Sequence, residues 1–514
     1  MQIAPYSLIT ANPTRVIKIL SAEQIREADR YTIEHESISS IDLMERAALA
    51  FAELFIKKYS PEHAIYIFCG YGNNGGDGLA IARILLKKNY PVLVYILAEN
   101  NKYSNDFLVN QSRLQKINDQ VIHFITEADD FPVINGNSLI IDALFGSGLN
   151  RSLSGIAEKL VSYLNIQEAV RVGVDIPSGL FPDRVREGAV FLAHHTLTFL
   201  QPKLAFLFPE SNEVVGEWEA IDIGLNKKFI QSLPCTHFLS EKSDMETILH
   251  SRGKFAHKGG FGHAFINAGN HGKMGAAILC AGACMRSGAG LTTVYVPEGT
   301  AGTLNAAIPE AMTLTYSTKI KSRDSFSSAA FGPGIGTDTY STAAFLRLLK
   351  KIKVPAVFDA DALNIISAQK KGLKLLPKNA IITPHLKEFE RLAGKTKNWY
   401  KRHKRQSELS QVHSIFIVLK GAFTCITTPD GLSYFNPTGN PAMAKGGSGD
   451  VLTGIIAGLL AQKYSSLQAA LLGVYLHGLS GDLAVKKQSV HSLLASDIIA
   501  TIGDAFRELG SEKL

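Results

Sequence analysis

The residue of this sequence best placed for chemistry is an aspartate that follows a run of glycines. Gly446, Gly447 and Gly449 lead to Asp450, and the apolar residues from 451 to 460 then recur at helical spacing. A helix therefore starts at or just before Asp450. The N–H groups at a helix N-terminus lack partners and favour anions, so this segment predicts a phosphate site with a carboxylate beside it. A tight turn followed by a favourable first-turn acid fits the same residues.

Four other polar segments of the second half each follow or end an apolar run. They are "FGPGIG" (331–336), "DADALN" (359–364), "TPHLKEF" (383–389) and "LKGAFT" (419–424). With Asp450 they predict a nucleotide-dependent phosphoryl-transfer site, in which Asp450 takes the proton of a substrate hydroxyl. Taken singly, His385 fits a core or capping histidine, and "KGAFT" fits a plain hairpin. No G-x-x-x-x-G-K-[ST] loop is present in the sequence, which excludes a Walker-type enzyme.

The first half contains a glycine motif that imitates a dehydrogenase fingerprint. "GYGNNGGDG" (70–78) follows a predicted strand and precedes a helix expected near 77–88, and Glu99 ends the next strand. Asp77, however, places a carboxylate among the N–H groups that would receive a pyrophosphate. We therefore expect a different ligand site here.

Two more strand ends of the first half carry polar residues. "DALFGSGLNRS" supplies Asp142 and the loop 146–152, and "VDIPSG" supplies Asp175 and Ser178. Each aspartate alone fits a loop cap, but the carboxyl ends of parallel strands converge on the edge where such sheets bind ligands. Asn74, Asp142 and Ser178 are hard oxygen ligands with one formal negative charge among them, which favours a monovalent cation over a divalent one.

The elements that position these residues follow an alternating pattern. Apolar runs at 64–70, 91–99, 138–146, 170–179 and 194–200 alternate with helical patterns, and a second alternating series follows an irregular polar stretch between about 224 and 253. Such alternation predicts mostly parallel sheets with helices on both faces. No fixed-period repeat links the two series. We therefore expect an α/β protein of two different domains, 1–228 and 229–514.

The bulk composition restricts the class of protein and its partners. The 514 residues are 46% hydrophobic and 19% charged, with a mild net charge of +7, as in a folded globular chain. The basic run "KRHKR" (401–405) fits a solvated face, so no nucleic-acid partner is expected. Five scattered cysteines without a CxxC pair indicate a reducing compartment. With neither a signal peptide nor a membrane span, we expect a cytoplasmic protein without a membrane partner.

The order of the motifs resembles a known family over nearly the whole chain. "GYGNNGGDGLAIAR", "DALFGSGL", "VDIPSGL", "HKGGFG", "GKMGAAILCAGACMRSGAG", "GPGIG", "DADALN", "TPHLKEF", "KGAFT" and "NPAMAKGGSGDVLTGIIAGLLAQ" together resemble the bacterial bifunctional NAD(P)H-hydrate repair enzymes. The resemblance implies a Rossmann-like, three-layer α/β/α epimerase domain followed by a ribokinase-like, ADP-dependent dehydratase domain.

The resemblance also implies roles for individual residues. In the first domain the hydrated cofactor would contact Asn73, Asn74, Gly75, Gly76, Asp77, Gly146, Ser147, Gly148, Leu149, Asn150, Arg151, Ser152 and Asp175. Asp175 is the candidate acid/base residue, and Asn74, Asp142 and Ser178 would bind potassium. In the second domain the hydrate would contact Ala276, Gly334, His385 and the catalytic Asp450, and the nucleotide would contact Lys420, Gly421, Ala422, Phe423, Thr424 and Gly449.

The implied substrates are the hydrates of NADH and NADPH together with ADP and Mg2+, and a homo-oligomer is expected. Two segments depart from the family pattern, "FPDRVREG" after "VDIPSGL" and Ala205 where glycine is common. Both lie beside the epimerase site. A small-molecule kinase of the ribokinase type, carrying a non-catalytic N-terminal binding module, remains the alternative function, and the choice between ADP and ATP remains open.

Overall fold

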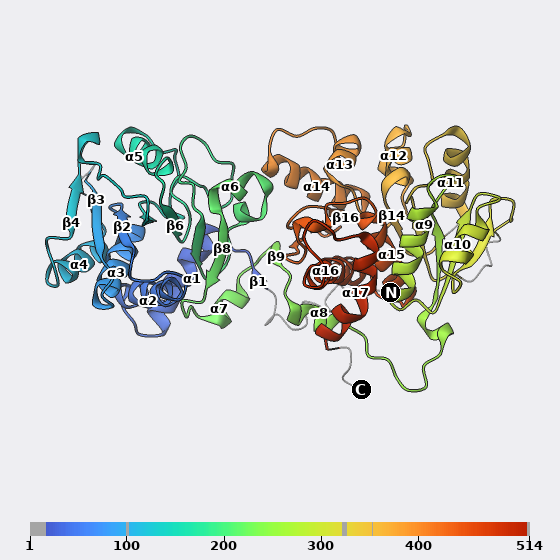
Figure 1. The fold of residues 1–514 in the computed structure, drawn as a ribbon, viewed down its shortest axis with the longest axis horizontal. Coiled ribbons are helices and arrows are strands. Elements are labelled where there is room, and N and C mark those ends of the chain that lie inside the picture. The colour runs from blue at the N-terminus through green and yellow to red at the C-terminus, as the bar shows by residue number, and fades with distance from the viewer. Residues whose placement is uncertain (1–16, 99–101, 321–325, 352, 511–514) are drawn as a thin grey trace. The chain divides into compact units, whose positions relative to one another are not determined.

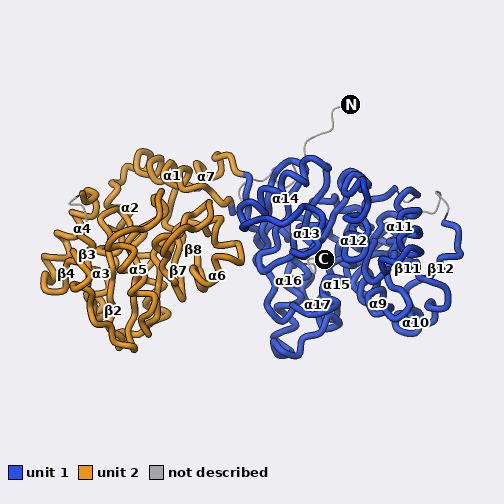
Figure 2. Tube along the Cα trace, turned by 90° about the horizontal axis from the view of Figure 1, so that it is seen from above, with its two compact units in different colours: residues 1–17, 236–514 blue, residues 18–235 orange. Residues whose placement is uncertain are grey.

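The computed structural model describes residues 17–98, 102–320, 326–351 and 353–510, which form two compact units (Figures 1 and 2). The unit that we call the first comprises residues 18–235 and is the orange unit 2 of Figure 2. The unit that we call the second comprises Ile17 with the residues from 236 onward and is the blue unit 1 of that figure. The expected domain boundary, 228/229, falls inside helix α7 (Lys227–Ser232). Glu99, the acidic residue of the apparent dehydrogenase fingerprint, lies outside the described residues.

The first unit is built on a seven-stranded sheet in which all paired strands are parallel. The strand order is β4-β3-β2-β5-β6-β7-β8. The bounds are β2 Ala64–Cys69, β3 Val92–Leu97, β4 Ile122–Ile125, β5 Ser138–Ala143, β6 Val170–Val174, β7 His195–Phe199 and β8 Glu217–Ile221. The order reverses between β2 and β5, and the carboxyl ends at such a reversal are where open parallel sheets bind ligands.

Helices cover both faces of this sheet. They are α1 Ala22–His35, α2 Ser40–Lys58, α3 Asn73–Lys87, α4 Asn105–Gln115, α5 Gly155–Asn165, α6 Asn212–Val215 and α7. Along β2, Ile65 and Ile67 join a buried cluster with α2 and α3, whereas Tyr66 and Phe68 join another with α5. This alternation gives the expected three-layer α/β/α architecture.

Helix α3 begins earlier than the sequence predicted. We expected it near 77–88, but it starts at Asn73, so residues 73–77 form its first turn and not a loop. Glycines have low helix propensity, which hid the start, but packing requires them here. A Cβ on Gly75 would lie 1.8 Å from the carbonyl oxygen of Gly70, and one on Gly78 would lie 2.6 Å from Cβ of Ala143. Tertiary packing therefore overrides propensity in this turn.

The second unit contains an eleven-stranded sheet in the order β1-β9-β18-β17-β16-β15-β14-β13-β10-β11-β12. The bounds are β1 Ile17–Lys18, β9 His237–Leu239, β10 His263–Asn267, β11 Leu291–Val296, β12 Met312–Thr315, β13 Ser328–Phe331, β14 Ala356–Phe358, β15 Ile381–Ile382, β16 Phe416–Leu419, β17 Cys425–Thr427 and β18 Ser433–Phe435. In this spatial order, the strands β16-β15-β14-β13-β10-β11-β12 all pair in parallel. Strand β17 is antiparallel to both of its neighbours, β16 and β18.

Helices of the second unit also pack on both faces of its sheet. They are α8 Lys242–Ile248, α9 Met274–Arg286, α10 Ala301–Ala307, α11 Thr339–Lys351, α12 Ala360–Ala368, α13 Leu386–Ala393, α14 Trp399–His413, α15 Ser448–Ala461, α16 Ser466–Val485 and α17 Ala495–Glu508. Residues of α9 and α15 to α17 share one buried cluster, and residues of α11 to α14 share another. The predicted architecture of two α/β domains with mostly parallel sheets is confirmed.

Close packing of α9 against α15 explains the small residues of both helices. A Cβ on Gly454 would lie 2.1 Å from the carbonyl oxygen of Cys280, and one on Gly458 would lie 2.5 Å from that of Cys284. Both cysteines are fully buried, as the shared helical face predicted. The contact fixes α15, and hence its N-terminus, relative to the sheet.

Candidate active sites

In the first unit, the ends of β5 and β6 are joined by a buried hydrogen-bond network. The Asp142 carboxylate accepts from the Ser178 hydroxyl at 2.6 Å, from the Ser178 N–H at 2.7 Å and from the Leu144 N–H at 3.1 Å. The Ser178 hydroxyl oxygen also accepts from the Phe145 N–H at 2.8 Å. Both side chains are fully buried. Burial raises the pKa of Asp142 to about 6, even though its hydrogen bonds favour the charged form.

These residues fit the cation that the sequence predicted. Asn74, also buried, lies in the first turn of α3, and a Cβ on Gly146 would sit 3.4 Å from its Oδ1 atom. The hydrogen bonds that Asp142 accepts come from the Ser178 hydroxyl and from the N–H groups of Ser178 and Leu144, none of which is charged. The oxygen atoms of Asp142, Ser178 and Asn74, with one negative charge among them, are of the kind that suits a monovalent cation. The potassium site itself stays a prediction.

Asp175, the candidate acid/base residue, is held in an unusual backbone conformation beside a buried lysine. Its φ angle is +65°, in the left-handed region that non-glycine residues rarely adopt. Its Oδ1 atom accepts from Lys203 Nζ at 2.6 Å and from the Phe199 N–H at 3.1 Å. The Lys203 side chain is only 1% exposed. Because a buried ammonium needs a paired anion, Lys203 and Asp175 fix one another.

Two further carboxylates share the electrostatic environment of Asp175. Burial, followed by the charges of Asp175, Asp29 and Asp106, raises the pKa of Asp77 well above its ordinary range. Burial and the charge of Asp175 raise the pKa of Asp29 to about 6, against the effect of Lys203. The environment thus favours the protonated form of Asp77, whereas Asp175 has a cationic partner. Two carboxyl groups in such different environments can divide the roles of acid and base.

The loop 146–152 runs from the end of β5 towards α5 and is partly exposed. It turns tightly, because the Leu149 N–H donates to the carbonyl of Gly146 at 3.2 Å. The two segments that depart from the family pattern contact each other, since the Ala205 N–H donates to the carbonyl of Pro182 at 2.9 Å. The departures therefore form one structural feature and not two.

In the second unit, the glycines before Asp450 form the N-terminus of α15, as predicted. Gly447 is the N-cap, with a φ angle of +93°, and a Cβ there would lie 2.6 Å from Cδ1 of Leu279. A Cβ on Gly449 would lie 3.2 Å from Lys420 Nζ and 3.4 Å from Asp359 Oδ2. Glycine at 449 thus keeps the helix N-terminus close to the lysine.

Asp450 lies in the first turn of α15, in surroundings that make it a proton acceptor near neutral pH. Burial and the charge of Asp359 raise its pKa to about 7, with a further contribution from Asp361, while Lys420 acts in the opposite direction. A general base works best when its pKa lies near the working pH.

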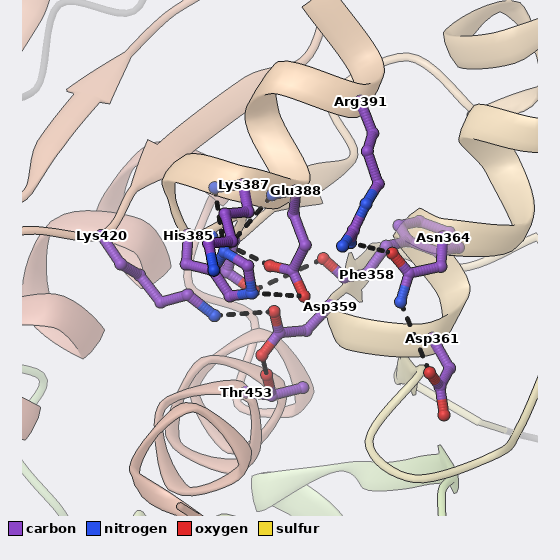
Figure 3. A network of polar contacts seen from close by, with 11 residues as sticks. Phe358, Asp359, Asp361, Asn364, His385, Lys387, Glu388, Arg391, Lys420 and Thr453 are labelled. Atoms are coloured by element: carbon purple, nitrogen blue, oxygen red, sulfur yellow. Dashed lines mark hydrogen bonds and ion pairs between the residues drawn. The ribbon is translucent and has the colours of Figure 1, made fainter. Parts of the chain in front are cut away.

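Asp359 and Lys420 belong to a network of polar contacts that joins several elements (Figure 3). Asp359 Oδ1 accepts from Lys420 Nζ at 2.9 Å, and its Oδ2 accepts from the Thr453 hydroxyl at 2.9 Å. The residues of "DADALN" continue the network, because Asp361 accepts from the Gly336 N–H at 2.9 Å. The segments 331–336 and 419–424 are therefore both joined to 359–364, which Thr453 links to α15.

Two segments show the local structures that were kept as alternatives. Lys420 to Thr424 form the turn between β16 and its antiparallel neighbour β17. His385 caps α13, where its Nδ1 atom accepts from the Lys387 N–H at 3.1 Å, and its side chain is half-exposed. Neither structure excludes ligand contact. The ligand roles of His385 and of residues 420–424 stay predictions.

Of the two small residues predicted to contact the hydrate, Ala276 lies in the first turn of α9, and Gly334 is in the loop after β13. A Cβ on Gly334 would lie 3.0 Å from Cβ of Ala276, so the structure brings the two together. Lys273, which precedes α9, lies 3.8 Å from Asp361. This contact brings the start of α9 towards the phosphoryl-transfer site.

Sequence reasoning missed several residues of both sites. Lys203 and Asp29 in the first unit, and Thr453 and His477 in the second, had no assigned role, and Asp359 was noted only as part of a motif. The Ser448 hydroxyl lies 3.2 Å from His477 Nε2, and burial lowers the pKa of this histidine to about 4, which keeps it neutral. Lys203 could have been found from the sequence, because it is a lysine within the otherwise apolar segment "PKLAF".

Within the described ranges, no cluster of three or more histidine, cysteine or carboxylate residues is arranged to hold a metal ion. No helix of those ranges combines the length and apolar character that crossing a bilayer demands.

A glycine-led helix N-terminus that places a carboxylate beside a lysine is suited to moving a phosphoryl group onto a hydroxyl, which defines a phosphotransferase-like site in the second unit. The chain is 34% identical to a bifunctional NAD(P)H-hydrate repair enzyme of Moorella thermoacetica over 96% of its own length and 97% of that relative. It belongs to the family of bifunctional NAD(P)H-hydrate repair enzymes.

A second relative and two family models agree with this membership. A repair enzyme of the same description from Escherichia coli is 32% identical, with 94% of this chain and 92% of that relative covered. The family model described as NAD(P)H-hydrate dehydratase matches residues 264–503, and the one described as YjeF-related protein N-terminus matches residues 40–205. An ADP/ATP-dependent NAD(P)H-hydrate dehydratase from Bacillus subtilis, crystallised with ATP and Mg2+, is 31% identical, with a TM-score of 0.48, over 52% of this chain and 97% of that one.

Proposed function

We propose that this chain repairs hydrated NADH and NADPH through two activities. The first unit interconverts the R and S forms of the hydrate at C6. The second unit removes water from the S form at the expense of ADP and yields NAD(P)H, AMP and phosphate. The observation that carries the proposal is Asp450, a carboxylate with a pKa raised to about 7 at the glycine-lined start of α15, beside Lys420.

Dehydration needs a better leaving group than hydroxide. Asp450 takes the proton of the C6 hydroxyl, and the hydroxyl oxygen attacks the terminal phosphoryl group of ADP, which releases AMP. The N–H groups at the start of α15 and the Lys420 ammonium stabilise the charge on the transferring group. The C6–O bond then breaks with loss of phosphate, the ring nitrogen supplies its electron pair, and loss of a C5 proton restores the double bond.

Epimerisation needs an acid and a base at a carbon that carries both a hydroxyl and the ring nitrogen. Asp175, paired with Lys203, accepts the hydroxyl proton as the bond from C6 to the ring nitrogen opens and leaves an aldehyde. Asp77 donates a proton to the ring nitrogen. Closure on the opposite face reverses both proton transfers and gives the other epimer.

Potassium in the first unit would be held by Asn74, Asp142 and Ser178. The ion would supply positive charge that compensates the buried Asp142 carboxylate, and Asn74 would tie the start of α3 to the loop that begins at Gly146. We assign the hydrate to residues 73–77 and 146–152 in this unit.

In the second unit we assign the hydrate to Ala276, Gly334, His385 and Asp450, and the nucleotide to residues 420–424 and Gly449. ADP enters with Mg2+ as part of the co-substrate. A homo-oligomer and a cytoplasmic location complete the proposal.

The products of the second unit test the proposed function. Pure protein is incubated with the S hydrate of NADH, ADP and Mg2+, and the products are separated by anion-exchange chromatography. The proposal expects NADH, AMP and inorganic phosphate in equal amounts. Accumulation of a phosphorylated hydrate without NADH would instead identify a ribokinase-type kinase.

A further inference from the structure

Asp359, the buried carboxylate that follows β14, contacts α15 through its side chain and does not cap α12, the helix that it precedes. Asp359 occupies the N-cap position of α12, yet its side chain makes no capping hydrogen bond there. The side chain is 2% exposed, and its two oxygens accept instead from Lys420 and Thr453, each at 2.9 Å (Figure 3). The next residue, Ala360, has a φ angle of +47°. Such backbone conformations persist where the surroundings enforce them.

These contacts tie three elements together beside the proposed base. Lys420 follows β16, Asp359 follows β14, and Thr453 lies on α15, three residues after Asp450. The start of α15 packs closely against Lys420 and Asp359 at Gly449, because a Cβ on this glycine would approach both side chains. Movement of Asp359 would therefore release the lysine and disturb the first turn of α15.

The charges that face Asp450 come from several elements. Asp359 and Asp361 lie after β14, and Lys420 follows β16. His477 on α16 is neutral, and Cys280 on α9 is a buried thiol whose pKa is raised by burial. Among the charged side chains, Asp359 has the largest effect on Asp450.

We propose that Asp359 is a positioning residue of the dehydratase: its carboxylate holds Lys420 at the nucleotide site and Thr453 on α15, and its negative charge makes Asp450, three residues before Thr453, a stronger base. The inference rests on the proposed function of the second unit. It assigns to Asp359 a role through Lys420 and Asp450, without contact to the substrate.

The test compares the pH dependence of kcat/KM for the S hydrate in wild type, Asp359→Asn and Thr453→Val. Loss of the Asp359 charge lowers the pKa of Asp450, so the acidic limb of Asp359→Asn moves to lower pH by about one unit. Its KM for ADP rises roughly tenfold, since Lys420 is no longer held. Thr453→Val removes a hydrogen bond but no charge, so its limb stays where that of the wild type lies.

A second pair of variants covers the case in which Asp359→Asn does not fold with a buried, unpaired lysine. Lys420→Met is compared with Asp359→Asn/Lys420→Met, which contains neither charge. The acidic limb of the pH profile should lie at lower pH in the double variant than in Lys420→Met. Coinciding limbs in either comparison would overturn the inference. A wild-type protein that forms no NADH from the hydrate and ADP would instead refute the proposed function.

Discussion

Replacing the proposed base by its neutral isostere, Asp450→Asn, should abolish dehydration and at the same time stabilise the second unit. Burial and neighbouring carboxylates raise the pKa of Asp450 from 3.8 to about 7, so the folded state resists ionisation of this group. Asparagine has nearly the same shape and no charge. Enzymes commonly sacrifice stability at such sites for function.

The magnitude follows from linkage. Between pH 3.8 and about 7 the folded state binds more protons at Asp450 than the unfolded state does. Asp450 therefore lowers the free energy of unfolding progressively as pH rises through that window. A shift of about three units at about 1.4 kcal/mol per unit gives roughly 4 kcal/mol at pH 8. The advantage of Asp450→Asn should shrink to less than half of that at pH 5 and vanish below pH 3.8.

Differential scanning calorimetry of the full chain tests this. The transition that ADP raises identifies the unit containing Asp450. At pH 8 its Tm should be higher in Asp450→Asn by about 5 °C or more, with a smaller gain at pH 5. Asp430→Asn, a change of an exposed aspartate before β18, is the matched control and should leave Tm unchanged. An Asp450→Asn variant no more stable than wild type at pH 8 would refute the electrostatic description of the site.

Three further predictions concern single contacts. Asp142→Asn should remove the dependence of epimerisation on potassium, seen in a titration of KCl against sodium at constant ionic strength; an unchanged potassium response would exclude Asp142 as a ligand. Lys203→Met leaves Asp175 without its cationic partner, so repair of the R form should fall about 100-fold while repair of the S form is unaffected. Stopped assays on the separate epimers would measure this, and equal losses on both forms would contradict the role of Lys203 in epimerisation. Gly449→Ala places a Cβ 3.2 Å from Lys420 Nζ, so KM for ADP should rise about tenfold, and an unchanged KM would argue against a nucleotide beside Gly449.

Patterns of apolar residues were sufficient to predict the architecture. The alternation of strand and helix patterns in both halves predicted two α/β units, and the glycines before Asp450 predicted a helix N-terminus, which the structure places at Ser448. Both features depend on residues close together in the sequence. Local periodicity therefore contained the information needed for them.

Contacts between distant residues were not predictable in the same way. The start of α3 at Asn73 depends on packing of its glycines against other strand ends, which no local propensity encodes. Lys203 pairs with Asp175, which lies 28 residues earlier, and Asp359 pairs with Lys420, which lies 61 residues later. Such pairs emerge only when the strand order is known.

The most direct test of the central claim is recovery of NADH from mixed epimers. The pure protein is incubated with both epimers of hydrated NADH, ADP, Mg2+ and K+, and the near-ultraviolet absorbance of the restored dihydronicotinamide is followed to completion. Two activities in one chain predict full recovery of both epimers, with one AMP and one phosphate for each NADH formed. Recovery of the S form alone would contradict an active epimerase in the first unit, and no recovery would contradict the repair function altogether.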